Sequence, residues 1–338
     1  MRKKAMPPRV KRILLTVLCV LIAAIIITLL LGAVYTKHLL GLINRNPDDS
    51  VMSTEISQDL EENDPDFTGP TIDPNDVNLN TNKEDVVNEK HIINLMLIGQ
   101  DCRTGQGRQR SDVMILCSIN TKTKEMNLIS FMRDLYVAIP GYEDNRMNAT
   151  YAFGGMKLLD EAMKVNFGVH LDGNLAVNFD GFEDVVDMIG GVDMYLTASE
   201  ANHIQKTYKL EAQEGMNHLD GKTALAYVRN RTVGNGDFSR TERQRKLLGA
   251  VFEKCKGMSL SQLKALTETV LPLITTDLTD GQILDYTAKI LPIVGQLKMN
   301  TQQIPADGTY QYASIRGMSV LVPDLEANRE ILKKILSK

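Results

Sequence analysis

An uncharged run from Ile13 to Val34 limits what this chain can fold into more than any other feature. A helix of that length spans the hydrocarbon core of a bilayer. The charged side chains of residues 1–12 are all basic, and such a flank is typical of the cytoplasmic side of a membrane. A cleaved signal peptide is the alternative, but its apolar core is normally shorter. The pattern predicts a cytoplasmic basic tail over 1–12, a retained transmembrane helix over 13–34 and an exported remainder.

Residues 35–90 have the composition of a linker. Between Pro47 and Lys90, thirteen acidic residues accompany only two lysines, and there are four prolines and few large apolar side chains. Such a segment buries too little apolar surface to fold by itself. We expect an extracellular acidic linker, disordered or loosely ordered, between the membrane and the folded part.

From residue 91 onward, the apolar pattern indicates one α/β domain, 91–338. Strands mixed with helices to the end of the chain are typical of that class. The expected strands are IINLMLIG, DVMILCSI, MNLISF and VDMYL, and the expected helices cover 156–167, 179–189, 239–256, 259–270, 280–291 and 323–336. The apolar faces at 156–167, 179–189 and 247–252 suit either the core or a groove for a lipid. Core packing is the more common role of such faces.

Composition excludes several functions. The net charge is −4, so no basic field points to nucleic acid. Aromatic residues are few and Trp is absent, which argues against a surface that stacks bases or sugars. The four cysteines lack metal-ligand spacing, so neither a zinc site nor a disulfide framework is expected.

The segment 227–245, YVRNRTVGNGDFSRTERQR, concentrates arginines around a glycine turn. Ser239 and Glu242 have the spacing of a capping box, so a helix is expected to begin at Ser239. Helix N-termini and arginine forks both suit phosphate or carboxylate groups. The segment therefore predicts a site for a multiply charged anion, and a solvated charged face is the alternative. The arginines are Arg229, Arg231, Arg240, Arg243 and Arg245.

The spacing within this segment predicts which side chains act together. Arg229 and Arg231 share a side if their backbone is extended. Arg240, Arg243 and Gln244 share one face of the first helical turns.

Acids at the predicted strand ends suggest a second half of the site. Open α/β sheets usually bind ligands at strand ends. Mg²⁺ prefers one or two carboxylates together with phosphate oxygens and waters. The pattern predicts a magnesium–diphosphate site, and a set of ion pairs that hold loops is the alternative. The acids are Asp101, Asp112 and Asp134, interleaved with Arg103, Arg110 and Arg133.

Several of these segments, taken in order, resemble the LytR-CpsA-Psr proteins of Gram-positive cell envelopes. NLMLIGQDCR is similar to the family's opening strand and G-x-D-x-R motif, and RQRSDVMIL and ISFMRDLYVAIPG resemble the two segments that follow. NATYAFGG, VNFDGFEDVVDMIGGV, HLDGKTALAYVRNR and GDFSRTERQR continue in family order. The resemblance extends over about 91–338 and includes the basic tail and single membrane span. It implies a single mixed-sheet α/β/α domain.

The resemblance also implies an activity. Members are thought to move a glycopolymer, of wall teichoic acid or capsule type, with its phosphate from a polyprenyl diphosphate lipid to peptidoglycan. This would make the chain a magnesium-dependent phosphotransferase of the polyisoprenyl-teichoic acid–peptidoglycan type, with Mn²⁺ as an alternative ion. A non-catalytic binder or regulator of lipid-linked precursors, and a diphosphatase that uses water, are the alternatives.

The resemblance assigns roles to individual residues. Asp101 and Asp112 match the acids associated with the metal, and Asp134 is a candidate base or supporting acid beside the catalytic Arg133. The diphosphate-binding set implied by the resemblance is Arg103, Arg133, Arg229, Arg231, Arg240, Arg243 and Gln244.

Overall fold

The computed structural model describes residues 34–45, 69–81, 89–100 and 108–337. The chain divides into two compact units, Met1–Ile43 and Asn44–Lys338. In the first unit, residues 34–40 are helical. The described ranges contain no helix that is long and apolar enough to cross a membrane. Apart from Val34, the predicted membrane span lies outside those ranges.

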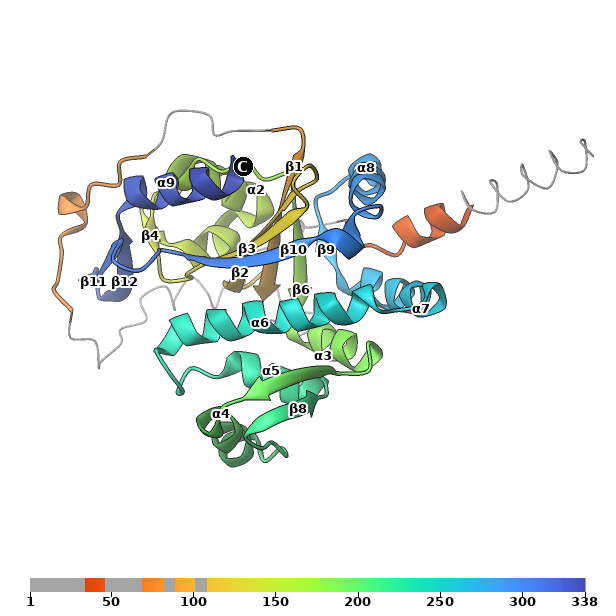
Figure 1. Ribbon diagram of the computed structural model, residues 1–338. Helices are drawn as coiled ribbons and strands as arrows, with labels where there is room; N and C mark the ends of the chain where they lie inside the picture. The colour runs from red at the N-terminus through yellow and green to blue at the C-terminus, as the bar shows by residue number, and fades with distance from the viewer. Residues whose placement is uncertain (1–33, 46–68, 82–88, 101–107, 338) are drawn as a thin grey trace, which may run out of the picture. The chain divides into compact units, whose positions relative to one another are not determined.

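A six-stranded mixed sheet organises the second unit (Figure 1). Its strands are β1 (Ile92–Gln100), β2 (Ser111–Asn120), β3 (Glu125–Phe131), β6 (Gly173–Asn178), β9 (Thr275–Thr276) and β10 (Lys298–Ile304). Their order across the sheet is β10-β3-β2-β1-β6-β9. β1–β2, β2–β3 and β6–β9 pair antiparallel, whereas β1–β6 and β3–β10 pair parallel. The sheet is therefore mixed, and the strands expected from the first three apolar runs are confirmed.

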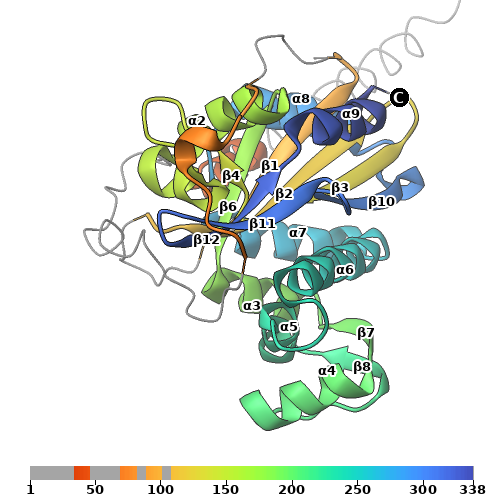
Figure 2. The ribbon, with the colours of Figure 1, turned by 90° about the vertical axis from the view of Figure 1, so that its left-hand side faces the viewer.

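Helices lie on both faces of this sheet (Figures 1 and 2). α2 and α9 cover one face, and α3, α5 and α6 lie on the other. The six expected helices are confirmed, and α6 begins earlier than the sequence indicated. α2 has a kink at Gly154 and Gly155, and the part after the kink is the expected helix 156–167. The helices are α2 (Met147–Phe167), α3 (Phe179–Met188), α4 (Ala198–His203), α5 (Gly221–Arg229), α6 (Gly236–Lys256), α7 (Leu260–Val270), α8 (Asp280–Ile290) and α9 (Leu325–Leu336).

The described residues also form three two-stranded sheets. They are β4 (Tyr136–Val137) with β5 (Asn145–Arg146), β7 (Val192–Leu196) with β8 (Gly215–Leu219), and β11 (Tyr310–Ile315) with β12 (Met318–Pro323). β7–β8 packs with α3 and α5 in one apolar cluster. β12 instead lies beside the segment after β3, where Leu135 and Leu321 form a parallel bridge.

The two faces of the sheet are packed differently. Met96 and Leu116 point to the face covered by α2 and α9, where they are fully buried in the largest core cluster. Their strand neighbours Leu97 and Ile115 point the other way, toward α3 and α6, because side chains alternate along a strand. On that second face the layers enclose a pocket.

The expectation of a loosely ordered spacer is wrong for residues 69–81. Thr71 forms a bridge with Ser314 on β11, and the amide of Ile72 donates to the Ser314 carbonyl at 3.0 Å. Ile72 and Val77 pack on the apolar cluster of the β11–β12 hairpin. The segment is acidic overall, but a few apolar residues suffice for it to pack along a fold that already exists. The rest of 46–90, apart from residues 89 and 90, lies outside the described residues.

Candidate active site

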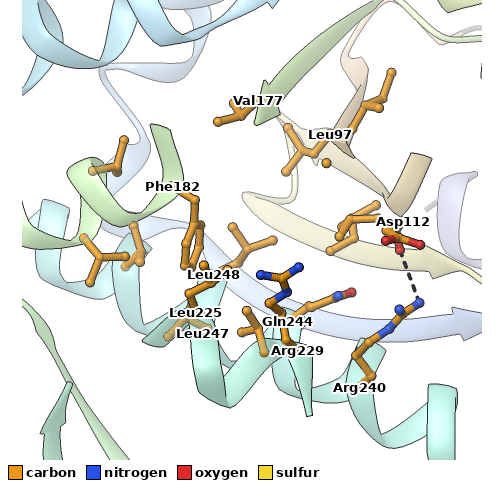
Figure 3. A pocket seen from close by; sticks show the side chains of 18 of the residues that line it. Leu97, Asp112, Val177, Phe182, Leu225, Arg229, Arg240, Gln244, Leu247 and Leu248 are labelled. Atoms are coloured by element: carbon orange, nitrogen blue, oxygen red, sulfur yellow. Dashed lines mark hydrogen bonds between the residues drawn. The ribbon is translucent and has the colours of Figure 1, made fainter. Parts of the chain in front are cut away.

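A pocket of about 570 Å³ lies between the sheet and the helices of its second face. β1, β2 and β6 form one wall, and α3, α5 and α6 form the other (Figure 3). Most of the lining is aliphatic or aromatic, including Leu97, Ile115, Leu175, Val177, Phe182, Leu225, Leu247, Leu248 and Val251. Core packing is correct for 156–167, whereas the apolar faces of 179–189 and 247–252 both pack in a core cluster and line this pocket.

One end of the pocket is charged (Figure 3). Asp112, Arg240 and Gln244 gather there, with the Arg229 guanidinium beside Gln244, while Phe182, Leu225 and Leu248 lie away from them. Arg231 lines the same pocket. The structure thus brings together five of the residues that the sequence singled out, from β2, α5, the following loop and α6.

Asp112 is the acidic centre of this end. Its Oδ1 accepts a hydrogen bond from Arg133 Nη1 at 2.8 Å and lies 3.8 Å from Arg231 Nη2. Arg240 Nη2 donates to the backbone carbonyl of Asp112 at 3.4 Å. Arg133 does not line the pocket, so it lies behind Asp112 and holds its carboxylate in place.

Asp237 bridges three arginines and was missed by sequence reasoning. One carboxylate oxygen is 2.8 Å from Arg240 Nη2 and 3.5 Å from Arg133 Nε, and the other is 3.6 Å from Arg231 Nε. The available signal was its spacing from Arg240, since residues three apart are neighbours on a helix. The expected helix start at Ser239 excluded Asp237 from the helix and concealed that signal.

The helix α6 begins at Gly236, and Asn235 is its N-cap, so the predicted capping box is wrong. Ser239 is already inside the helix, where its Oγ accepts from the amide of Asn235 at 2.7 Å. The turn that leads into α6 needs glycine, because Gly234 and Gly236 have φ values of +86° and +50°. The earlier start places Asp237 and Arg240 in the first turns, beside the charged end of the pocket.

A short turn after α5 fixes the position of Arg231. Arg229 ends α5 and is helical, so the condition of an extended backbone is not met, yet Arg229 and Arg231 both line the pocket. Asn230 leaves the helix in an extended conformation, and its side-chain oxygen accepts from the amides of Thr232 and Val233 at 3.0 and 3.1 Å. This Asx-type turn fixes the backbone on both sides of Arg231.

Burial and charge have opposite effects on the acids of the site. Burial raises the pKa of Asp112, but the nearby charges of Arg133, Arg240 and Arg231 outweigh it and hold that pKa below its usual range. Burial raises the pKa of Asp134, and here the charges of Arg133 and Arg146 do not fully compensate. Asp112 therefore stays ionised at neutral pH and is poorly suited to accept a proton.

Asp134 lies outside the pocket lining. Its Oδ2 is 3.5 Å from Arg133 Nε, and its Oδ1 is 3.7 Å from Arg146 Nη1. This placement favours the supporting role over that of a base in direct contact with substrate. The buried Arg146, which sequence reasoning did not single out, completes the cluster.

Arg243 lies away from the pocket, which corrects its expected place in the diphosphate set. It is buried, and Nε donates to Glu200 Oε1 at 2.8 Å. Its two terminal nitrogens donate to the carbonyls of Asn230 and Val233 at 2.8 and 2.6 Å. Arg243 is three residues from Arg240 but faces α4 instead of the sheet, and it holds the turn that carries Arg231. Arg245 is also buried and does not line the pocket.

We expect Arg243→Ala to lower the free energy of unfolding by about 3 kcal/mol near neutral pH, since it leaves the carboxylate of Glu200 without its buried partner. The hydrogen bonds from Thr197 and Arg243 hold the pKa of Glu200 below its usual range, although burial alone would raise it. The ion pair therefore stabilises the fold above the ordinary glutamate pKa and is lost as pH falls through the lowered one. Denaturant unfolding of both proteins at several pH values measures this difference.

The control for this measurement is Lys289→Ala on α8, which removes an exposed ion pair with Asp285. It should leave the free energy of unfolding close to that of wild type, because exposed ion pairs contribute little. A loss for Arg243→Ala that is equally small, or that does not shrink in acid, would contradict the structural role given to Arg243.

Asp101 and Arg103 lie outside the described residues. Within the described ranges, no group of three or more metal-ligating side chains could hold an ion. Asp112 nevertheless suits Mg²⁺, because it is an ionised carboxylate at the charged end of the pocket and the ion needs only one or two such groups beside phosphate oxygens.

Fold and site together define an α/β protein that can hold an amphiphilic anion, with an apolar pocket for a tail and arginines for a head group. The model of the LytR_cpsA_psr family matches residues 52–335. A teichoic acid transferase, TagU of Bacillus mycoides (strain KBAB4), is 30% identical over 265 residues, which are 73% of this chain and 82% of TagU.

Solved structures agree with this assignment. TagT bound to LIIa-WTA has a TM-score of 0.62 and 26% identity, over 76% of this chain and 93% of that one. A LytR-CPS2A-psr family protein, YwtF (TagT), with bound octaprenyl pyrophosphate lipid has a TM-score of 0.58 and 25% identity, over 76% and 95%. This chain belongs to the LytR-CpsA-Psr family.

Proposed function

We propose that this protein transfers a glycopolymer, with its proximal phosphate, from a polyprenyl diphosphate lipid to a hydroxyl group of peptidoglycan. The observation that carries the proposal is one pocket with two chemical halves: an apolar part of hydrocarbon character and an end formed by Asp112, Arg229, Arg231, Arg240 and Gln244. A polyprenyl diphosphate has the same two halves. The related TagU is named a polyisoprenyl-teichoic acid–peptidoglycan teichoic acid transferase, and the related TagT holds octaprenyl pyrophosphate.

The chemistry follows from the charges. An acceptor hydroxyl oxygen attacks the phosphorus that carries the glycopolymer, and a new P–O bond forms. The bond from that phosphorus to the bridging oxygen breaks, polyprenyl monophosphate leaves, and the hydroxyl proton is lost. Negative charge builds on the non-bridging and leaving oxygens, and arginine donors fixed in a low-dielectric site stabilise it.

We assign this role to Arg240 and Arg231, which line the pocket. Arg133 bonds to Asp112, and Asp134 pairs with Arg133 and Arg146. Mg²⁺, or Mn²⁺ in its place, would be held by Asp112 together with Asp101 and would neutralise phosphate charge.

The test is transfer of a labelled polymer. The full-length protein in detergent is mixed with a lipid-linked polymer that carries the label in its sugars, with peptidoglycan fragments and Mg²⁺. We expect label on peptidoglycan and stoichiometric polyprenyl monophosphate. Release of free polymer phosphate with or without peptidoglycan would identify a diphosphatase instead, and tight lipid binding without turnover would identify a binder.

We also propose that the protein is anchored by residues 13–34, with its N-terminus in the cytoplasm and residues after about 35 outside. The support is the basic flank of the uncharged run. Protease added to intact wall-less cells should digest the domain, while an epitope tag at the N-terminus should resist until lysis. Digestion of the tag in intact cells, with the domain protected, would reverse the orientation.

A further inference from the structure

An aromatic series begins at Phe238, next to Asp237 of the charged cluster, and its inner members pack against the largest core cluster. The ring of Phe238, in the first turn of α6, stacks on Tyr310 with centroids 5.2 Å apart and planes 25° apart. Tyr310 meets Tyr312 edge to face at 5.6 Å. Phe238 is buried and Tyr310 is partly buried, whereas Tyr312 is 47% exposed. The series therefore leads from the interior to solvent.

Two segments of the charged cluster contact this aromatic series. Phe238 directly follows Asp237, the acid that bridges three arginines. Tyr312 pairs with Leu321 on β12, and the Leu321 amide donates to the Asp134 carbonyl at 2.9 Å. The β11–β12 hairpin thus contacts the two segments that supply Asp134 and Asp237. Tyr310 and Tyr312 are two apart on a strand, so they share one face of it.

The order of groups along α6 indicates what this face meets. Phe238 comes first, Arg240 and Gln244 follow at the charged end, and Leu247, Leu248 and Val251 line the apolar part. A lipid-linked glycopolymer has the order sugar, diphosphate, hydrocarbon. With the hydrocarbon toward Val251 and the diphosphate at Arg240, its first sugar lies on the side where α6 begins.

Exposed tyrosines suit a sugar ring. A pyranose has faces of C–H groups that pack on an aromatic ring, and its hydroxyls need hydrogen-bond partners at the edge. Tyrosine offers an apolar ring and a polar tip in one rigid side chain. The exposed side chain of Asp307, shortly before β11, adds a further hydrogen-bonding group.

We propose that Tyr312, supported by Tyr310 and Phe238, forms a subsite for the sugar attached to the donor's diphosphate. The inference rests on the proposed function, since it names the part of the same donor that this surface recognises. Aromatic residues are few in the chain, but three of them are gathered here, which composition alone could not reveal.

The test compares two lipids of equal chain length: octaprenyl diphosphate alone, and octaprenyl diphosphate that carries one N-acetylhexosamine. Binding to the full-length protein is measured by calorimetry. We expect Tyr312→Ala to weaken binding of the sugar-bearing lipid on the order of tenfold, as an aromatic contact of that kind is worth up to about 1.4 kcal/mol. Binding of the bare diphosphate should be unchanged, and Tyr312→Phe, which keeps the ring, should retain most of the affinity.

The matched control is Tyr195→Ala, another exposed tyrosine, on β7. It should affect neither lipid. Equal affinity of wild type and Tyr312→Ala for the sugar-bearing lipid would overturn the subsite, as would an equal loss for both lipids or an effect only on the peptidoglycan KM. Failure of the wild type to bind bare octaprenyl diphosphate would instead contradict the proposed function.

Discussion

Arg240→Ala is expected to reduce glycopolymer transfer about 10²- to 10³-fold, the usual cost of removing one fixed donor from the site of a developing negative charge. Arg240 is buried and lines the pocket, and its Nη2 is anchored by Asp237 at 2.8 Å. Burial lowers the pKa of the guanidinium, although Asp237 opposes this. Its buried Nε has no hydrogen-bond partner among the described residues.

The substitution Arg240→Lys tests the positive charge of this side chain separately from the planar shape of its guanidinium. Lysine keeps the positive charge but cannot reproduce the planar fork that contacts Asp237 and a phosphate together. We expect its rate to fall between those of wild type and Arg240→Ala, measured as labelled polymer transferred per unit time. The loss should appear in kcat and in kcat/KM, since the interaction strengthens in the transition state.

The control for Arg240 is Lys246→Ala on the same helix, whose exposed side chain pairs with Glu242. It should transfer polymer at the wild-type rate. A full rate for Arg240→Ala in a folded protein would contradict the placement of the diphosphate at this end of the pocket.

Leu248→Trp is expected to weaken binding of long polyprenyl diphosphates on the order of a hundredfold. Leu248 lines the apolar part of the pocket opposite the sheet, and a larger ring there takes space from several isoprene methylenes, each worth about 0.8 kcal/mol when buried. Binding of a short-chain diphosphate such as geranyl diphosphate should change little, because its head group still reaches the arginines. Titration with lipids of increasing chain length measures this divergence.

Leu284→Trp provides the comparison, since Leu284 is 47% exposed on α8 and does not line the pocket. It should leave binding unchanged at every chain length. If Leu248→Trp behaved in the same way, the apolar part of the pocket would not be the place of the tail.

Much of the fold could be predicted from periodicity. The runs that became β1, β2 and β3 are apolar on both faces, which indicates strands covered on both sides. α7 and α8 have full capping boxes, at Ser259 and Thr279, so their starts were visible. α6 was misplaced because its start depends on two glycines with positive φ, and a true cap at Asn235 makes no side-chain bond.

The site was predictable in its residue types but not in their partners. Arg240 and Arg243 lie three residues apart, yet Arg240 lines the pocket and Arg243 holds a turn. Only the packing of α4, which brings Glu200 to Arg243, separates them. The pocket itself could not be predicted, because a hydrophobic stripe that lines a cavity has the same pattern as one that fills a core.

The carboxylate of Asp237 has a consequence for how product leaves. Asp237 and Asp112 are resident counterions of the arginines, so a phosphate that binds beside them gains less attraction than unpaired arginines would offer. The donor's diphosphate spreads its negative charge over two phosphoryl groups, whereas the lipid left after transfer carries its charge on one. We therefore expect the donor to engage more of these arginines at once than the spent carrier does, which favours return of the carrier to the membrane.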